Sequence, residues 1–491
     1  MEFRVLGNHV LERIKVEAAV YPFLGPERTI DTVQKAQAAL VAAYHDAGYG
    51  TVLVDIPEQS VDDGVVRLKV TEGHIGRVRV EGARYYSQRH ILAALPAIAP
   101  GTVPQLPQLQ SELGQLAAEA RDRTITPVLK SGSAPGTMDV DLAVKDHLPL
   151  HGSLAVDNRY SADTTHTRLT ATLSYDNLFQ RNESLSLTYQ VAPSDPSQVK
   201  LWVLSYLGHL PTPNWDWNIY AIHSQSNVAA LGTLSVVGNG EVYAAHLVHA
   251  FGSSASSVNS LNIGADYKNF PQSVLLPGDV GSDTPIHYVL WSAQVATTRL
   301  HERYDLSGSV GAYFGLPGIG GDDAEFEFKR FGATPSFAYL RGSGSLTWRL
   351  WHGFALVGRT EFQYTDSPLV SNEQFTLGGL DTVRGYLEAE ELVDAGVAGT
   401  LELHSPKLTL GRSETFAYLF YERGVGMIQQ PLPSEIDAGL VRSDLTSLGF
   451  GVQLTASQGL NANLAFADPL LTGSRTQRGD ARLLFSFLYG F

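Results

Sequence analysis

The sequence contains no cysteine among its 491 residues. This absence excludes a disulfide-linked scaffold, a thiolate metal site and a cysteine nucleophile. Charged residues are also scarce, at 17% of the chain against about 25% in an average soluble domain. Lysine and arginine number 35 and aspartate and glutamate 50, so the net charge of −15 argues against a nucleic-acid-binding protein.

Long apolar runs are missing as well. The longest run, Ala38 to Tyr44, has seven residues, whereas a membrane-spanning helix needs about 20. A membrane role stays open, because the strands of a β-barrel cross a bilayer without such a run. Met1 to Leu6 do not form the basic and then apolar start of a signal peptide, so we expect the signal peptide to be absent from this chain.

Glycine and aromatic residues are abundant by contrast. The chain has 47 glycines, and 10% of its residues are aromatic. Low charge combined with high glycine and aromatic content favours a β-rich protein with unusual surfaces.

The first 148 residues combine helical and strand periodicity. Ile30, Val33, Leu40 and Tyr44 recur at helical spacing, and short alternating segments lie on either side. The pattern predicts two tandem β-α-α-β-β domains, at residues 1–73 and 74–148. Each is expected to have an edge strand, at residues 52–56 in the first and 124–130 in the second, where Pro127 favours an edge position.

From residue 149 the helical signal disappears. Segments of about 10–15 residues alternate between apolar and polar side chains and are separated by turn residues. Sixteen candidate strands begin near residues 150, 166, 183, 198, 214, 237, 258, 286, 304, 335, 353, 395, 415, 446, 459 and 481. An even number of strands, with long connections only after odd-numbered ones, predicts a transmembrane antiparallel β-barrel over residues 149–491. A large soluble β-domain is the alternative.

The connection after the eleventh candidate strand carries the sequence Gly378-Gly379-Leu380-Asp381-Thr382-Val383-Arg384-Gly385-Tyr386. It resembles the V-R-G-[FY] loop of the outer-membrane assembly and secretion transporters that join POTRA domains to a sixteen-stranded barrel. Residues 44–49, 56–59, 63–68, 70–73 and 135–140 are similar to the POTRA domains of two-partner secretion transporters, the TpsB class of haemolysin secretion and activation type. The resemblance implies that residues 371–392 fold back into the barrel lumen.

The resemblance also assigns roles to individual residues. The expected lumen-loop and gating residues are Val383, Arg384, Gly385, Tyr386, Glu422 and Gly424. The family usually has aspartate where this chain has Glu422, so the geometry of the pair with Arg384 is an open question. Tyr489 and Phe491 are expected to form the barrel-insertion signal. The plug helix of the family is missing from this chain, either because it was removed or because it does not exist.

The resemblance implies a transporter that recognises an unfolded, TpsA-type secreted exoprotein and passes it through the barrel without hydrolysing nucleotide. Edge-strand addition would bind the client at Val52, Val54, Ile56, Ile125 and Leu129. We expect a monomer in the Gram-negative outer membrane, with POTRA domains in the periplasm. Its partners would be lipids and, during biogenesis, the barrel-insertion machinery, and it would use no nucleic acid, cofactor or metal. Alternatives are a factor that assembles outer-membrane proteins, or a passive porin or barrel enzyme.

Motifs of competing chemistry are weak. Leu316 to Asp323 is glycine-rich, but we expect it to be an external loop that no helix follows. The acidic group of Asp322, Asp323, Glu325 and Glu327 is interpreted as solvated rather than as a cation site. Neither a His-Glu-x-x-His nor a Gly-x-Ser-x-Gly motif occurs, so we expect no enzyme.

Overall fold

The structure is a computed structural model, and it divides the chain into an N-terminal unit, residues 1–149 with 179–182, and a second unit made of the remainder. It describes residues 1–491 except 27, 62–63, 163, 227, 232–233, 238, 255, 275–281, 434–435, 437–438, 440 and 458. None of the helices in the described part of the chain is both long and apolar enough to cross a membrane.

Residues 1–73 form a first subdomain, with two helices against a three-stranded sheet of order β1-β3-β2. Strand β3 alternates Val66, Leu68 and Val70 toward the helices, and these side chains pack with Leu40 and Tyr44 of α2. The elements are β1 (Glu2–Leu6), α1 (Arg13–Val20), α2 (Ile30–Asp46), β2 (Leu53–Asp55) and β3 (Val65–Thr71). The predicted β-α-α-β-β order is present.

Residues 74–148 repeat this arrangement with a sheet of order β4-β6-β5. Strand β5 lies at the edge, and its Pro127 lies opposite Leu142 of the central strand β6. An edge position tolerates proline because one side of the strand has no partner for an N–H group. The elements are β4 (His74–Glu81), α3 (Gln88–Ala93), α4 (Leu106–Glu119), β5 (Arg123–Ser131) and β6 (Thr137–Asp146).

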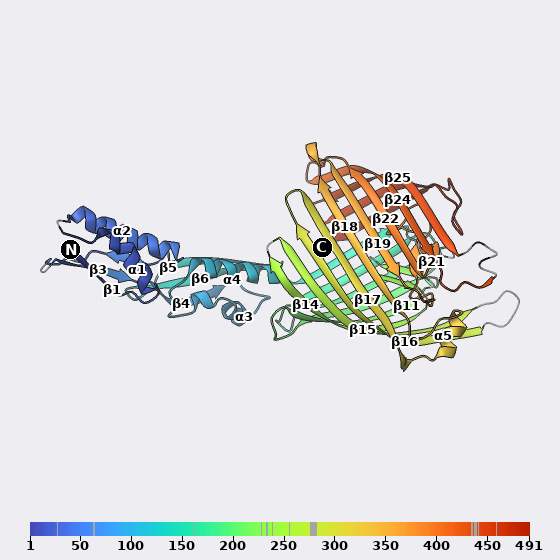
Figure 1. Cartoon of the computed structure of the whole chain (residues 1–491), viewed down its shortest axis with the longest axis horizontal. Helices are drawn as coiled ribbons and strands as arrows, with labels where there is room; N and C mark the ends of the chain where they lie inside the picture. The colour runs from blue at the N-terminus through green and yellow to red at the C-terminus, as the bar shows by residue number, and fades with distance from the viewer. Residues whose placement is uncertain are drawn as a thin grey trace. The chain divides into compact units, whose positions relative to one another are not determined.

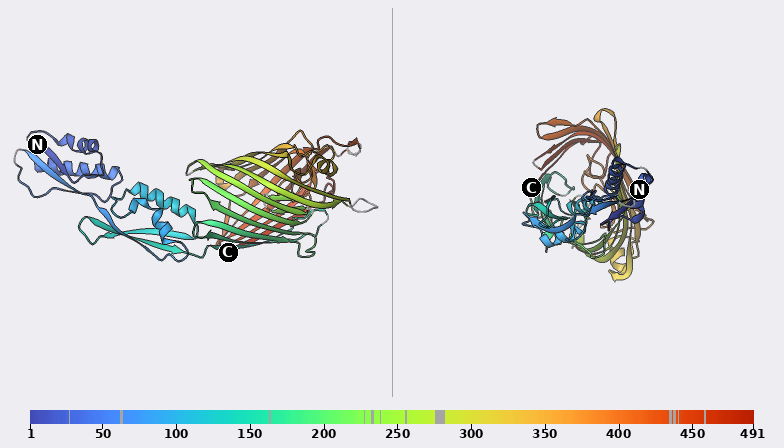
Figure 2. Two further views of the ribbon diagram at one scale, coloured as in Figure 1. Left: turned by 90° about the horizontal axis from the view of Figure 1, so that it is seen from below. Right: turned by 90° about the vertical axis from the view of Figure 1, so that its left-hand side faces the viewer.

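The second unit is a closed antiparallel barrel, whose long tilted strands are seen in Figure 1 and in the left view of Figure 2. Short β23 and long β22 both pair with β24, so they are two pieces of one wall strand. The wall therefore has sixteen strands among the described residues, which confirms the predicted architecture. The wall strands are β7 (Leu150–Asp157), β8 (Arg168–Leu178), β9 (Glu183–Val191), β10 (Lys200–His209), β11 (Trp215–Gln225), β14 (Gly240–Ser254), β15 (Ser257–Val274), β16 (Ser282–Leu300), β17 (Tyr304–Gly320), β18 (Ala338–Arg349), β19 (Ala355–Tyr364), β22 (Ala395–His404), β23 (Leu408–Leu410), β24 (Ser413–Met427), β25 (Arg442–Ala456), β26 (Leu460–Pro469) and β27 (Arg482–Gly490).

Alternation along each wall strand separates two environments. On β24, Leu419 and Tyr421 are 61% and 46% exposed on the outer face, while Tyr418, Phe420 and Glu422 are buried on the inner face. Exposed apolar rows of this kind are stable only against lipid, and the polar inner positions face the lumen. The alternation of apolar and polar residues in the sequence therefore reflects side chains that point alternately to the lipid and to the lumen.

The ends of the wall meet where β27 pairs with β7, over residues 486–490 and 153–157. We call this junction the seam. The amide of Phe491 donates to the carbonyl of Gly152, and the amide of Gly152 donates to the carbonyl of Phe491, each at 2.9 Å. A Cβ at Gly152 would lie 2.3 Å from the Phe491 ring, so a side chain there would require that ring to move.

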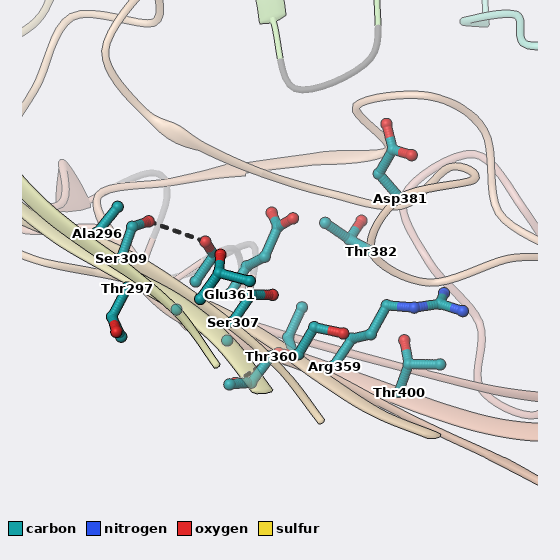
Figure 3. Close-up of a pocket in the computed structure, with 16 residues that line it drawn as sticks. Ala296, Thr297, Ser307, Ser309, Arg359, Thr360, Glu361, Asp381, Thr382 and Thr400 are labelled. Carbon is teal, nitrogen blue, oxygen red and sulfur yellow. Dashed lines mark hydrogen bonds between the residues drawn. The ribbon is translucent and has the colours of Figure 1, made fainter. Parts of the chain in front are cut away.

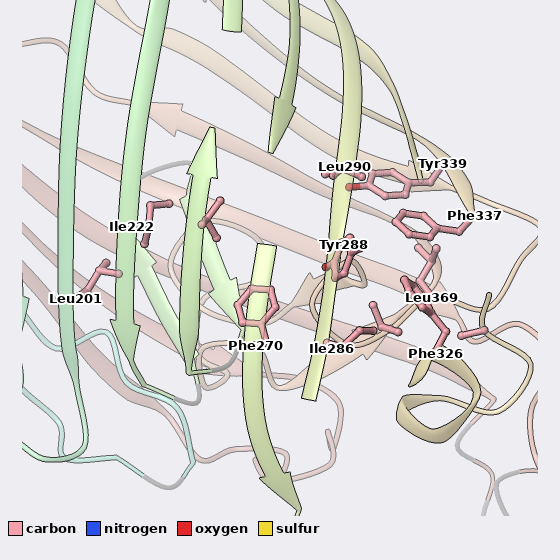
Figure 4. Packing of buried hydrophobic residues seen from close by; sticks show 13 residues of the cluster. Leu201, Ile222, Phe270, Ile286, Tyr288, Leu290, Phe326, Phe337, Tyr339 and Leu369 are labelled. Atoms are coloured by element: carbon pink, nitrogen blue, oxygen red, sulfur yellow. The ribbon is translucent and has the colours of Figure 1, made fainter. Parts of the chain in front are cut away.

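The connection between β17 and β18 corrects one prediction. We expected no helix after the glycine-rich segment, but α5 (Asp323–Lys329) follows it directly. The Asp322 carboxylate accepts the amide of Glu325 at 2.9 Å and thereby begins the helix. Phe326 is 1% exposed and packs against Tyr288 and Phe337, as Figure 4 shows. The sequence rule failed because this apolar anchoring lies outside any local pattern.

Candidate functional site

The loop between β19 and β22 folds back as a hairpin whose stem is β20 (Phe375–Leu377) paired with β21 (Glu391–Val393). We call residues 371–392 the lumen loop. Its apolar side chains form a buried cluster with the wall residues Ala398 and Leu445; the loop members are Phe375, Leu377, Val383 and Tyr386. The loop is thus packed as part of the interior of the barrel.

Glycines make the tight path of the lumen loop possible. Gly378 has a φ of +97°, and a Cβ there would lie 2.6 Å from the Leu387 carbonyl oxygen. Gly385 has a φ of +94°, but a Cβ there would reach Pro469 only at an ordinary 3.4 Å. Gly385 is therefore required for its backbone conformation rather than for close approach to the wall.

Arg384 is held to the wall by Glu422 of β24. The Arg384 amide donates to Glu422 Oε2 at 2.6 Å, and its Nε donates to Glu422 Oε1 at 2.8 Å. Thr400 Oγ1 donates to the same carboxylate at 3.1 Å. Glutamate in place of aspartate therefore keeps a two-oxygen contact, with one bond to the backbone and one to the guanidinium.

A second carboxylate, Glu402 of β22, completes the arginine site, and the sequence analysis missed it. Arg384 Nη2 donates to Glu402 Oε1 at 2.6 Å, and Arg359 Nη2 donates to Glu402 Oε2 at 2.8 Å. His404 Nε2 lies 2.7 Å from Oε2. Glu402 shares the inward parity of Thr400, which faces Glu422 across β22 and β24. Drawing that strand register from the sequence would have revealed it.

The Arg384 guanidinium also stacks on an aromatic ring, lying 3.7 Å from the centroid of Phe420. Burial by itself lowers the pKa of this guanidinium, but the Glu422 carboxylate more than offsets it and holds the pKa above its ordinary value. The group is therefore charged at every physiological pH, and the loop is fastened by a permanent cation. Breaking such a buried pair by removing one partner costs about 3–5 kcal/mol.

The remaining predicted loop residues lie in the same site. A Cβ at Gly424 would lie 2.9 Å from both Leu377 and Val383, so this glycine leaves the space that the loop fills. The Tyr386 hydroxyl donates to the Leu471 carbonyl at 2.7 Å and lies 3.0 Å from the Thr446 carbonyl. All six predicted residues are therefore brought together, and their gating role stays a prediction.

The opposite wall holds the start of the lumen loop through Glu373, which the sequence analysis did not single out. Lys268 Nζ and the Tyr288 hydroxyl each donate to Glu373 Oε1 at 2.5 Å, and the Tyr339 hydroxyl donates to Oε2 at 2.7 Å. Figure 4 shows Tyr288 and Tyr339 among the apolar side chains that surround this point. The loop is thus anchored on both sides of the lumen.

An open space remains beside the loop tip. A cavity of about 340 Å³ is lined by small and hydroxyl side chains of β16 to β19 and β22, by Arg359 and Glu361 of β19, and by Asp381 and Thr382 of the loop (Figure 3). Ser309 and Ser343 share a hydrogen bond of 3.0 Å on its wall. The lumen is therefore narrowed by the loop and has a polar wall where it stays open.

Of the predicted client-binding residues, Val54 lies on β2 and Ile125 and Leu129 lie on β5. Val52 and Ile56 flank β2, which covers only Leu53–Asp55. Val52 and Val54 are buried in the first subdomain, whereas Leu53 between them is 63% exposed. Ile125 is partly buried and Leu129 is 40% exposed on β5.

The Tyr489 ring lies 6.1 Å from that of Phe491 at the seam, so the predicted insertion signal also helps to close the barrel.

Comparison with known families agrees with this geometry. Residues 136–454 match the model of the haemolysin secretion/activation protein family ShlB/FhaC/HecB, and residues 1–73 match the ShlB-type POTRA domain. The chain belongs to the ShlB/FhaC/HecB family. It is accordingly an outer-membrane β-barrel protein of a transporter family, with periplasmic POTRA domains.

Individual relatives of this ShlB-type chain are distant. The outer membrane transporter CdiB of Dickeya dadantii (strain 3937) is 23% identical over 70% of this chain and 61% of its own length. The heme/hemopexin transporter protein HuxB of Haemophilus influenzae is 20% identical over 91% of this chain and 79% of its own. The chain thus spans about three fifths of the CdiB length.

Solved structures show the same fold. CdiB from Escherichia coli has a TM-score of 0.64 at 17% identity, covering 100% of this chain and 90% of that one. BamA from Haemophilus ducreyi, lacking POTRA domains 1–3, has a TM-score of 0.61 at 13% identity, covering 100% of this chain and 99% of that one. The barrel fold is therefore shared beyond the ShlB/FhaC/HecB family.

Proposed function

We propose that this protein exports an unfolded exoprotein partner of the TpsA type. Its POTRA subdomains would recognise the client in the periplasm, and the barrel would pass it to the cell surface without hydrolysing nucleotide. The observation that carries the proposal is the lumen loop, held across the barrel by the buried Arg384–Glu422–Glu402 cluster. A buried ion pair in a polar lumen suits a loop that must be displaced and then return to its place. The arginine and the carboxylates can each be hydrated while the loop is displaced.

The POTRA subdomains offer two edges for an extended client. Strand β5 covers Arg123–Ser131 and leaves one side free of sheet partners, whereas β2 covers only Leu53–Asp55. Because Val52 and Val54 fill the core, a client at β2 would meet the backbone and the Leu53 side chain. The longer β5 edge is the stronger candidate for strand addition.

A photo-crosslinker at Leu129 should trap the client in transit, and one at Leu92, exposed on α3, should not.

The decisive experiment compares the proteins of the culture medium, cell surface and outer membrane with and without the gene. Loss of one large β-rich exoprotein, with other barrels unchanged, would support the proposal and identify the client. Re-expression of the wild-type chain should restore that protein, and Glu422→Gln should not.

The second candidate is a factor that assembles other outer-membrane proteins, which the BamA-like fold favours. In the same comparison this function would deplete many barrels at once. A porin or barrel enzyme would leave both sets of proteins unchanged.

A further inference from the structure

Arg159 is a second, partly buried arginine that binds the lumen loop, from a different part of the wall than Glu422 and Glu402. It follows β7, the first wall strand, and its side chain is 14% exposed. Its Nε donates to Glu388 Oε1 at 3.1 Å, its Nη2 lies 3.5 Å from Glu388 Oε2, and it pairs with Asp381 as well. Both carboxylates belong to the lumen loop, on either side of Arg384.

The two residues that flank Arg159 hold the last strand of the barrel. Asn158 Nδ2 donates to the Leu483 carbonyl at 2.8 Å, and the Phe485 amide donates to Asn158 Oδ1 at 2.8 Å. The guanidinium of Arg482 lies 4.3 Å from the centroid of the Tyr160 ring. Leu483, Phe485 and Arg482 all belong to β27, so residues 158–160 reach across the seam. We call these three residues the seam clip.

The seam clip contacts the loop through its backbone too. The Glu388 amide donates to the Tyr160 carbonyl at 3.1 Å. Glu388 Oε1 also accepts the Leu380 amide at 3.0 Å, which fixes that carboxylate within the loop. Three consecutive residues therefore join the first wall strand, the last wall strand and the lumen loop.

We propose that Arg159 positions the lumen loop and couples its docking to closure of the β7–β27 seam. The proposal rests on the proposed function only in taking displacement of the loop as the opening step. When the loop leaves, Arg159 loses both carboxylates and Tyr160 loses the Glu388 amide, so the clip retains its hold on β27 alone. Coupling between two sites is reciprocal, so a looser loop must mean a looser seam, and the converse.

Hydrogen exchange of the full chain in lipid nanodiscs tests both directions without a client. In Arg159→Gln, amides of the loop segment 380–388 should exchange about tenfold faster, since a partly buried charge pair is lost. In Arg384→Gln, which removes the charged contacts of the loop with β22 and β24, the Phe485 amide on β27 should exchange faster as well. Arg423→Gln is the matched control, because Arg423 forms a two-bond pair with Asp444 on the outer face and touches neither loop nor clip.

Two results would overturn the proposal. One is unchanged loop exchange in a folded Arg159→Gln protein; the other is unchanged exchange at Phe485 in Arg384→Gln. If Arg159→Gln does not assemble, Glu388→Gln removes the same pair from the loop side while keeping an acceptor for the Leu380 amide. The exchange measurement uses no client. A negative result in the export experiment would therefore not affect it, and unchanged exchange would not argue against export.

Discussion

The two units differ in how many charged side chains they bury. In the described part of the N-terminal unit the interior is almost wholly apolar, and Glu72 and Arg123 are its buried charged residues. The barrel buries many more charges, which are Asp157, Arg168, Glu183, Glu373, Arg384, Glu390, Asp394, Glu402 and Glu422. It also buries apolar clusters on its inner side, and it displays further apolar residues on the outside, where they contact lipid.

The difference shows what each unit has to do. A small soluble domain gains its stability from apolar burial and needs one fixed interior. The barrel wall is held by backbone pairing around a closed ring, so its interior is free to carry polar groups. Those groups hold the lumen loop in a specific position, together with the apolar cluster around Val383 and Tyr386.

The largest effect should come from the charged interior. Arg384→Gln leaves Glu422 and Glu402 buried without their shared cation, so loop docking should weaken by about 3–5 kcal/mol. Hydrogen exchange across residues 378–388 measures the loss. Arg423→Gln, at an exposed pair, should change docking by less than about 1 kcal/mol. Equal effects of the two variants would contradict the role of the buried cluster.

A core substitution in the N-terminal unit should follow in size. Leu142 is fully buried on β6, and Leu142→Ala should destabilise that unit by about 2–5 kcal/mol. The urea midpoint of the unit, followed by pulse proteolysis, reports the change. Leu419→Ala on the lipid-facing surface of β24 is the matched control and should leave that midpoint where it is. A shifted midpoint in this control would mean that the two units are not independent in stability.

A smaller effect should result from filling the space beside the loop. Gly424→Ala places a Cβ 2.9 Å from Leu377 and Val383, which should cost about 1–3 kcal/mol of docking. Gly358→Ala on β19 has nothing within 4 Å of the new Cβ and serves as the control. Loop exchange measures both variants. If Gly424→Ala behaved like Gly358→Ala, the loop would be shown to adjust at no cost.

The smallest effect concerns a charge in the N-terminal unit. The His90 side chain, with help from Arg123, lowers the pKa of Glu119 against the opposing effect of burial. A lowered carboxyl pKa stabilises the fold above the unfolded pKa of about 4.3, and that stability is lost as the pH falls through the folded pKa. Glu119→Gln should therefore lower the urea midpoint slightly at pH 7, with the difference vanishing in acid. A difference that persists at low pH would point to packing instead.

The sequence predicted the barrel wall well because its signal is local. Strands expected near residues 150, 183, 304 and 395 begin at those positions, and those expected near 166 and 481 begin at 168 and 482. A period of two, broken by turn residues, is visible within ten residues of chain. The lumen loop was predicted through a short motif and its place after the eleventh strand.

The partners of the loop were harder to predict, because they lie far apart in sequence. Glu373 meets Lys268 over 105 residues, and Arg159 meets Glu388 over 229. No local period links such pairs, and they follow only from the three-dimensional path of the loop. Glu402 could have been predicted from the sequence. The register of the neighbouring strands β22 and β24 is enough to place its side chain on the inner face near Glu422.

The burial of the Arg384 cluster also determines how strongly the docking of the lumen loop depends on salt outside the cell. An outer-membrane protein meets whatever salt concentration surrounds the cell, and ion pairs exposed to water weaken as dissolved ions screen them. The Arg384 and Glu422 side chains are 6% and 2% exposed, so screening barely reaches them. The lumen loop should therefore stay docked with nearly the same free energy in fresh water and in brine.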